Sequence, residues 1–166
     1  MQLELFSSKI PLGRAACFTG HRELPRGQEL LALHSKLLAE IDRAVSDGIT
    51  VFFAGGAVGF DMLAAEAIAK LQATYPALQL VLALPCRNHD KSWCDDDRDR
   101  LAEIITSGAQ VIFVSDEYTT TAMTKRNRFM VDNSELVIAY FDGNPRTGTG
   151  ATVRYAANTG KKVIIL

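Results

Sequence analysis

Six short apolar runs, separated by helical patterns, constrain the fold of this chain more than any other feature of its sequence. The runs are rich in β-branched and aromatic residues and cover residues 15–19, 50–54, 78–84, 109–114, 136–141 and 162–166. They are continuously apolar rather than alternating, which is typical of parallel strands that are covered on both faces. We therefore expect each run to be a buried strand.

Helical patterns lie between these runs, over residues 60–71, 97–107, 122–133 and 152–159. Between the first two runs, six residues form an apolar stripe at helical spacing: Leu30, His34, Leu37, Leu38, Ile41 and Val45. His34 is predicted to be a core residue rather than a catalyst. Strands and helices that alternate in this way predict an α/β fold. We expect one Rossmann-like domain over residues 1–166, with a mostly parallel sheet of about six strands and helices on both faces.

The composition narrows the class of protein. A chain of 166 residues is long enough to bury one core. No apolar run approaches the roughly 18 residues that would suggest a membrane span, and the N-terminal segment lacks a charged region followed by an apolar one. Three cysteines cannot all pair, which disfavours a disulfide framework. These features predict a cytoplasmic protein with no membrane partner.

The charge balance points to a small ligand. The formal net charge is -1, which disfavours broad binding to a nucleic-acid backbone, although a local cluster of cations is enough to hold a small anion. A DNA-binding module would need a basic surface, and a steep salt dependence of single-strand binding would reveal it. Six residues could cluster after folding to form such a surface: Lys125, Arg126, Arg128, Arg154, Lys161 and Lys162.

A glycine break, "GGAVG" at residues 55–59, separates the second predicted strand from the next helix. In open α/β sheets ligands bind at the carboxyl ends of the strands, where helix N-termini present unpaired N–H groups. We expect Gly55, Gly56 and Gly59 to let a phosphate or another oxyanion approach the backbone. The alternative is tight packing between strand and helix, because the pattern is neither GxGxxG nor GxxxxGK[ST].

Two further polar loops follow strands of the same sheet. The first carries Thr19, Gly20, His21 and Arg22, and the second carries Thr147, Gly148, Thr149 and Gly150. Hydroxyls and backbone amides suit phosphate and ribose oxygens, and Arg22 is able to pair with a phosphate in a bidentate fork. In the alternative interpretation Thr149 and Thr152 cap the last helix, and Arg22 and Arg154 are solvated.

The predicted helix at residues 122–133 adds an amide and two cations. Met123, Asn127, Met130 and Val131 share one face, so Asn127 is predicted to point inward, where an amide needs partners. It would bond a ligand or the glycine loop, or else tie down a neighbouring loop. Arg126 and Arg128 flank it, and we expect them on the surface, where an arginine is able to close over phosphates.

Five blocks in order carry a resemblance to a known family: "FTGHR", "GGAVGFDMLAAE", the tryptophan of "KSWCDDDRDRL", "RNRFMVDNSELVIAYFDG" and "TGTGATVRYAANTGKKVIIL". The chain resembles the YpsA-like family of the SLOG group, Rossmann-like domains that include the Lonely Guy phosphoribohydrolases and the DprA/Smf proteins. The resemblance implies a pocket for a nucleotide-type ligand, such as a nucleotide, NAD or ADP-ribose, and it implies self-association. One departure is "TGTG", where a double glycine followed by threonine is expected.

The resemblance leaves three classes of function open. A ligand sensor would bind a nucleotide without turnover, an N-glycosidic hydrolase would release a base from a nucleoside monophosphate, and a DprA-like module would bind single-stranded DNA. Hydrolysis needs a carboxylate near the anomeric carbon, for which Asp61, Glu66 and, as an acid-base group, His21 are the candidates. Helical geometry turns Glu66 toward solvent. Asp61, in the first turn, either reaches ribose hydroxyls or favours the helix dipole.

A metal site is not expected. Cys86, His89 and Cys94 are ligand types, but their spacing matches none of the usual zinc patterns. Trp93, between them, either stacks on a base or packs against the core.

Overall fold

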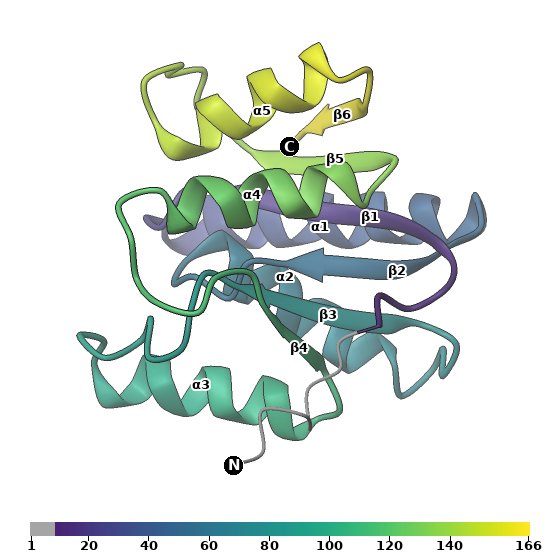
Figure 1. Ribbon diagram of the computed structural model, residues 1–166. Helices are drawn as coiled ribbons and strands as arrows, with labels where there is room; N and C mark the ends of the chain where they lie inside the picture. The colour runs from purple at the N-terminus through teal and green to yellow at the C-terminus, as the bar shows by residue number, and fades with distance from the viewer. Residues whose placement is uncertain (1–8) are drawn as a thin grey trace.

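The computed structural model describes residues 9–166, whose centre is a six-stranded parallel sheet (Figure 1). Each strand pairs with its neighbours in parallel, in the order β4-β3-β2-β1-β5-β6. The strands match the six predicted runs to within one or two residues: β1 (Arg14–Gly20), β2 (Ile49–Ala54), β3 (Gln79–Leu84), β4 (Gln110–Phe113), β5 (Leu136–Tyr140) and β6 (Lys162–Ile165). The predicted α/β, Rossmann-like fold is therefore confirmed.

Helices cover both faces of the sheet: α1 (Gly27–Ser46), α2 (Phe60–Leu71), α3 (Asp95–Thr106), α4 (Ala122–Asp132) and α5 (Gly148–Asn158). Figure 1 shows α4 in front of the sheet and α1 and α2 behind it. Buried residues of α1, α2 and α3 share one hydrophobic cluster, and those of α4 and α5 share the other. Within residues 9–166, no helix is long and apolar enough to cross a membrane.

The continuous apolar runs are explained by these two clusters. Successive side chains of a strand point to opposite faces, so Phe52 stacks on Phe18 in the first cluster, with ring centroids 5.8 Å apart, whereas Phe53 meets Phe129 of α4 in the second, at 6.2 Å. Because both faces of the sheet are buried, successive residues of a central strand are all apolar. Alternating apolar and polar residues are typical of a strand with one face in solvent.

The order of the strands creates a crevice at one edge of the sheet. The chain moves outward from β1 through β2 and β3 to β4, and then returns to pair β5 with the other side of β1. Gly20 at the end of β1 lies in register with Tyr140 at the end of β5. The segments that follow β1 and β5 lead to helices on opposite faces, and ligands of open α/β sheets bind at such a switch point.

Two helix predictions need correction. The buried residues of α1 are Leu33, Leu37, Ile41 and Ala44. The helix therefore packs on the sheet with a face that is offset by about one residue from the predicted stripe. For this reason His34 is half-buried and not a core residue. Helix α5 begins at Gly148, four residues before the predicted start, because the Thr147 hydroxyl caps it by accepting from the Gly150 amide at 3.0 Å.

The three cysteines differ in accessibility, which predicts their reactivity. Cys17 and Cys86 are buried and Cys94 is exposed. Burial raises the pKa of the Cys17 thiol to about 12, so it carries no thiolate at neutral pH. We expect iodoacetamide to modify Cys94 in the native protein and the other two only in denaturant, as read by peptide mass spectrometry. Native modification of Cys17 as fast as Cys94 would contradict the structure.

Candidate functional site

A cavity of about 290 Å³ opens in the crevice at the ends of β1 and β5. Its walls come from four segments that are far apart in the sequence: the end of β1 with the loop after it, Ala57 with the first turn of α2, the facing side of α4, and the N-terminus of α5. Most of the predicted ligand-binding residues lie in these walls. We call this space the central cavity.

The end of β1 and the loop that follows it contribute four of the predicted residues: Thr19 and Gly20 from the strand, and His21 and Arg22 from the loop. The backbone amide of Asp142 donates to His21 Nε2 at 3.1 Å. Asp142 Oδ1 lies 3.2 Å from the same nitrogen, so Asp142 contacts His21 through both its backbone amide and its carboxylate. His21, one of the three catalytic candidates, therefore lies in the cavity wall in a fixed orientation.

Arg22 is the cation of this loop that is available to a ligand. Its side chain is exposed and lines the central cavity. Within residues 9–166 no hydrogen bond or ion pair restrains its guanidinium. A guanidinium presents several N–H donors to a phosphate or carboxylate, so Arg22 is placed to bind an anion without giving up an existing partner.

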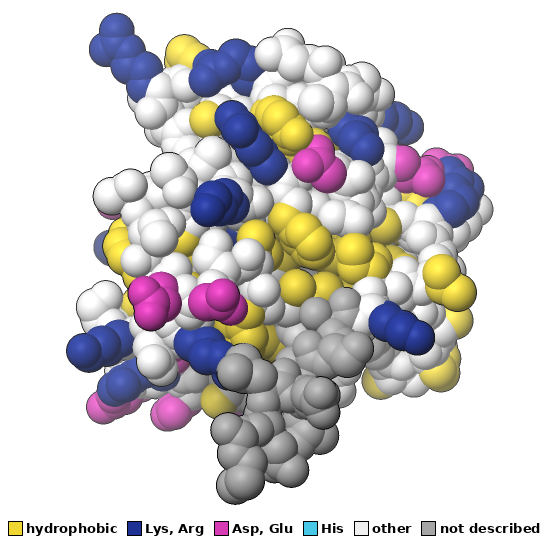
Figure 2. Space-filling view, in the orientation of Figure 1, with side chains coloured by type: hydrophobic (Ala, Val, Ile, Leu, Met, Phe, Trp, Pro, Cys, Tyr) yellow, Lys and Arg dark blue, Asp and Glu magenta, His cyan; other side chains and the backbone are white. Residues whose placement is uncertain are grey.

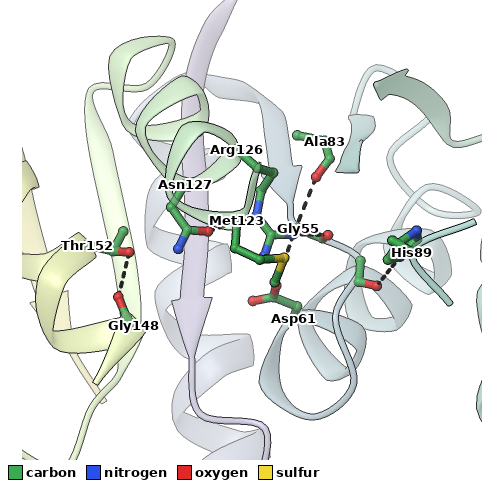
Figure 3. Close-up of polar contacts among 10 residues, drawn as sticks. Gly55, Asp61, Ala83, His89, Met123, Arg126, Asn127, Gly148 and Thr152 are labelled. Atoms are coloured by element: carbon green, nitrogen blue, oxygen red, sulfur yellow. Dashed lines mark hydrogen bonds and ion pairs between the residues drawn. The ribbon is translucent and has the colours of Figure 1, made fainter. Parts of the chain in front are cut away.

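Arg126 corrects a sequence prediction, because it is buried and not on the surface. Only 3% of the residue is exposed. Its guanidinium Nη1 lies 3.9 Å from Asp61 Oδ2 and donates to the carbonyl oxygen of Gly55, at the end of β2 (Figure 3). The long side chain lines the central cavity and carries its charge from α4 to α2. Arg126 therefore joins three elements.

The carboxyl of Asp61 faces opposing influences. Burial raises its pKa, whereas Arg126, the backbone amide of Ala57 and Arg22 act in the opposite direction. Burial likewise lowers the pKa of Arg126, and Asp61 opposes that change. The negative charge of Asp61 and the positive charge of Arg126 therefore compensate each other. Asp61 lines the cavity as an acceptor, a position compatible with the predicted contact to ribose hydroxyls.

Asn127 is half-buried and lines the same cavity, as the inward-facing prediction required. Its Oδ1 accepts from Arg126 Nε at 2.8 Å, so Arg126 sets the orientation of the amide (Figure 3). With its oxygen occupied in this way, the Asn127 amide offers its NH₂ group as a donor. The exposed neighbour, Arg128, lies outside the central cavity.

The N-terminus of α5 forms the wall opposite the α2 side. Thr147, Gly148 and Thr149 line the cavity, and a Cβ added to Gly148 would meet no atom within 4 Å. First-turn amides of a helix have no acceptor within it and favour anions. The cap is Thr147, not Thr149 or Thr152 as the alternative interpretation had it. Gly150 is buried, and a Cβ added to it would lie 2.5 Å from the carbonyl oxygen of Asn144.

The three glycines of the break lie outside the cavity wall, although Ala57 between them lines it. Gly55, Gly56 and Gly59 are buried and do not line it. A Cβ on Gly55 would lie 2.5 Å from Asp61 Oδ2, and one on Gly59, where φ is +95°, would lie 2.5 Å from Arg22 Cα. These glycines are needed for close packing, which was the alternative interpretation of the motif. That they contact a ligand stays a prediction.

Glu66 does not reach the central cavity. It accepts from Arg100 Nε of α3 at 2.8 Å, and its side chain is 30% exposed. The predicted turn toward solvent is only half correct, because helix α3 packs beside this face of α2 and supplies a cation. Of the two carboxylate candidates for hydrolysis, only Asp61 lies in the cavity.

A second cavity of about 590 Å³ adjoins the first, and the two share Arg22, Ala57, Met123 and Arg126. Its other wall includes Trp93, which the sequence had singled out, together with Asn88 and Tyr118, which it had not. Tyr118 lies in a loop, where no periodic pattern marks it in the sequence. It is the exposure of its aromatic ring in the structure that identifies it.

His89 and Cys94, two residues near Trp93 whose side chains are of types that ligate metals, contact other groups of the protein. His89 Nε2 lies 3.3 Å from the Gly56 carbonyl oxygen, and Cys94 Sγ donates to Asp97 Oδ2 at 3.3 Å. Burial lowers the pKa of His89, which favours a neutral ring. In the part of the chain that the structure describes, no three or more His, Cys, Asp or Glu residues are grouped to hold a metal ion.

The fold is similar to two solved structures. DNA processing protein A from Helicobacter pylori, described with a single-stranded DNA binding mode, has a TM-score of 0.64 at 18% identity, over 92% of this chain and 65% of that one. The structural genomics target TM1055 has a TM-score of 0.55 at 16% identity, over 90% of this chain and 72% of that one. At these identities the likeness concerns the fold alone.

Sequence relatives cover most of the chain. The uncharacterized SPbeta prophage-derived protein YoqJ of Bacillus subtilis is 29% identical over 143 residues, which are 78% of this chain and 83% of that protein. A UPF0398 protein of Bacillus cereus is 27% identical over 121 residues, and the match spans 64% of its length. The family model YpsA matches residues 18–163, and the chain therefore belongs to the YspA SLOG family.

Proposed function

We propose that the protein binds a nucleotide or a nucleotide derivative in the central cavity. The observation that carries this proposal is the position of Arg22, unrestrained within residues 9–166, in one cavity with the N-terminus of α5. A guanidinium and the first-turn amides of a helix are both donors that favour a phosphate. Gly148 leaves open space beside those amides.

The remaining walls suit a ribose. Asp61 supplies a carboxylate oxygen and the Asn127 amide supplies N–H donors, both in the central cavity. A sugar hydroxyl both donates and accepts, so it pairs with either group. In our proposal the phosphate lies at α5 and Arg22, and the ribose lies toward Asp61. Family membership and the fold shared with a single-stranded DNA-binding protein support the nucleotide class.

Binding without hydrolysis is the form of the proposal that the carboxylates favour. Glu66 is paired with Arg100 away from the cavity, and Asp61 is buried beside Arg126. Of the two carboxylates, hydrolysis would therefore depend on Asp61 alone, and Asp61 is already engaged by Arg126. Hydrolysis of a nucleoside monophosphate remains the alternative, and release of a free base by the purified protein would establish it.

The first experiment is a thermal-shift screen against AMP, ADP, ATP, NAD and ADP-ribose, followed by a chromatographic assay for released base. A ligand at a hundredfold excess over Kd stabilises the native state by about 2.7 kcal/mol. We expect Gly148→Val to abolish the shift without loss of stability, because its side chain enters open space. Ala157→Val, an exposed change on the same helix, is the control. No shift from any of these ligands would refute the proposal.

Arg22 provides a second test of the phosphate subsite. We expect Arg22→Gln to weaken binding of a stabilising nucleotide by about tenfold or more, because a hydrogen bond to a charged group contributes about 1.5–3 kcal/mol. Arg26→Gln in the same loop removes an exposed charge that lies outside the central cavity and serves as the control. Titration calorimetry measures both. Equal losses for the two variants would indicate a general charge effect and no contact at Arg22.

A strand of nucleic acid is a second candidate ligand, favoured by one observation. From residue 143 to residue 166 the chain has no Asp or Glu, whereas Arg146, Arg154, Lys161 and Lys162 lie there. Figure 2 shows Lys and Arg side chains gathered over the region of α4 and α5. A cavity of about 280 Å³ between these helices includes Arg128 and Arg154. The net charge of the chain disfavours nucleic acid as a partner, and this local cluster of cations is the feature that keeps it as a candidate.

Salt dependence separates this candidate from a small ligand. If a labelled oligothymidylate binds along α4 and α5, its affinity falls steeply with salt, and Arg128→Gln and Arg154→Gln each reduce the slope of log K against log salt by about 1. Arg43→Gln on α1 is the control. Binding that is independent of salt, or equally affected by all three variants, would exclude this surface.

A further inference from the structure

The second cavity, next to the central one, has walls of a different chemistry. It is about 590 Å³, and its lining includes the aromatic rings of Trp93 and Tyr118 and the amide of Asn88. We call it the aromatic cavity. Because the two cavities share Arg22, Ala57 and Met123, a ligand held in the first is able to extend directly into the second.

Trp93 is held in place by the neighbouring histidine. The rings of Trp93 and His89 meet edge to face, with centroids 5.1 Å apart and planes at 83°. His89 Nε2 in turn lies 3.3 Å from the Gly56 carbonyl oxygen. The glycine loop therefore anchors the indole through His89, just as its Gly55 carbonyl accepts from Arg126. This loop lines both cavities through Ala57 and holds a side chain in the wall of each.

Tyr118 and Asn88 are unusual at their positions. Tyr118, in the segment between β4 and α4, is 72% exposed, although a tyrosine ring gains stability by leaving water. Asn88 is the non-glycine residue within 9–166 that has a positive φ, +56°. Asparagine adopts this left-handed conformation more readily than most residues, and the turn presents its amide to the cavity. An amide donates and accepts, which suits the edge of a base.

We propose that the aromatic cavity is the base subsite of the nucleotide. A planar base stacks against the rings of Trp93 and Tyr118, Asn88 bonds its edge, and Arg22 lies between this base and the phosphate at α5. Aromatic side chains bind bases of any type through their faces. The inference rests on the proposed function, because the phosphate in the central cavity determines where the base can reach.

Trp93 makes the test direct, because it is the one tryptophan of the chain. Tryptophan emission is recorded while AMP, GMP, CMP, UMP or ribose 5-phosphate is added. We expect a monophosphate with a base to quench the emission. Ribose 5-phosphate should displace the monophosphate from the protein without quenching the emission. Because it lacks a base to stack, its affinity should be at least about tenfold lower than that of the monophosphate.

Tyr118→Ala completes the design, since an exposed ring can be removed without unfolding the protein. We expect it to weaken binding of the quenching monophosphate by about tenfold and to leave ribose 5-phosphate unaffected. Tyr75→Ala, a tyrosine 46% exposed and outside both cavities, is the control. Nucleotides that bind without quenching, with the affinity of ribose 5-phosphate, would overturn the base subsite alone. If neither nucleotides nor ribose 5-phosphate bind, the proposed function fails as well.

Discussion

Replacing Arg126 with methionine is expected to lower the free energy of unfolding by about 3–5 kcal/mol, because breaking a buried ion pair leaves one charge without compensation. Arg126 is 3% exposed, lies beside Asp61, and donates to the carbonyl oxygen of Gly55. The methionine fills much of the same volume, so most of the loss comes from the stranded carboxylate and carbonyl. Urea denaturation followed by circular dichroism measures the change.

Two further variants separate the ion pair from side-chain size. Arg128→Met, on the same helix but exposed, should change the free energy of unfolding by less than about 0.5 kcal/mol. Adding Asp61→Leu to Arg126→Met removes the stranded charge and should recover part of the loss. If Arg126→Met were as stable as Arg128→Met, the buried pair would have no part in holding α4 to α2.

The loss in Arg126→Met should depend on pH, with a sign set by Asp61. Burial raises the pKa of this carboxyl above its unfolded value, and Arg126 is the largest opposing influence. Without the arginine the pKa rises further. A carboxyl with a raised folded pKa destabilises the fold progressively as pH rises from the unfolded to the folded pKa. The variant should therefore regain stability relative to the wild type as pH falls through that range, and adding Asp61→Asn should abolish the effect.

Replacing Gly59 with alanine is the second change with a large expected effect. Its φ of +95° disfavours a side chain, and the new Cβ would lie 2.5 Å from Arg22 Cα, which is backbone and cannot move aside. At φ 95° and ψ -128° the conformational cost is about 1–3 kcal/mol, which with an overpacking cost of about 1–3 kcal/mol predicts a loss of about 2–6 kcal/mol. Thermal and urea unfolding measure it.

Gly108→Ala is the matched control for this prediction. Gly108 has a similar φ, +109°, but a Cβ there would meet nothing within 4 Å. Only the conformational part, about 1–3 kcal/mol, should be lost. Because Arg22 shapes the cavity, Gly59→Ala should also weaken nucleotide binding, whereas Gly108→Ala should not. Equal losses of stability in both variants would show that the clash at Arg22 is relieved by movement.

Much of the fold was readable from local patterns. Continuous apolar runs predicted the six strands, and the spacing of apolar residues predicted α2 with its observed bounds, Phe60–Leu71. The order of the polar loops also predicted which segments would meet, because the carboxyl ends of parallel strands share one edge. Thr19, Arg22, Asp61 and Gly148 do line one cavity. Such patterns are local, so a single sequence carries them.

The errors concern side chains whose partners are distant in the sequence. Arg126 was expected on the surface because charged residues are seldom buried without a partner, and its partner, Asp61, lies on another helix. Glu66 was expected in solvent because nothing in its own helix indicated Arg100. Neither pairing leaves a periodic trace.

The sequence by itself determined the alternation of strands and helices, the edge of the sheet where polar loops gather, and the family of the chain. Only the tertiary structure showed which atoms the glycines of the break pack against. Gly55 and Gly59 do not line the cavity; they let Arg126 and the backbone of Arg22 approach closely. A glycine that admits a ligand and one that admits another part of the protein have the same letter, and the difference is which atoms occupy the space where a Cβ would be.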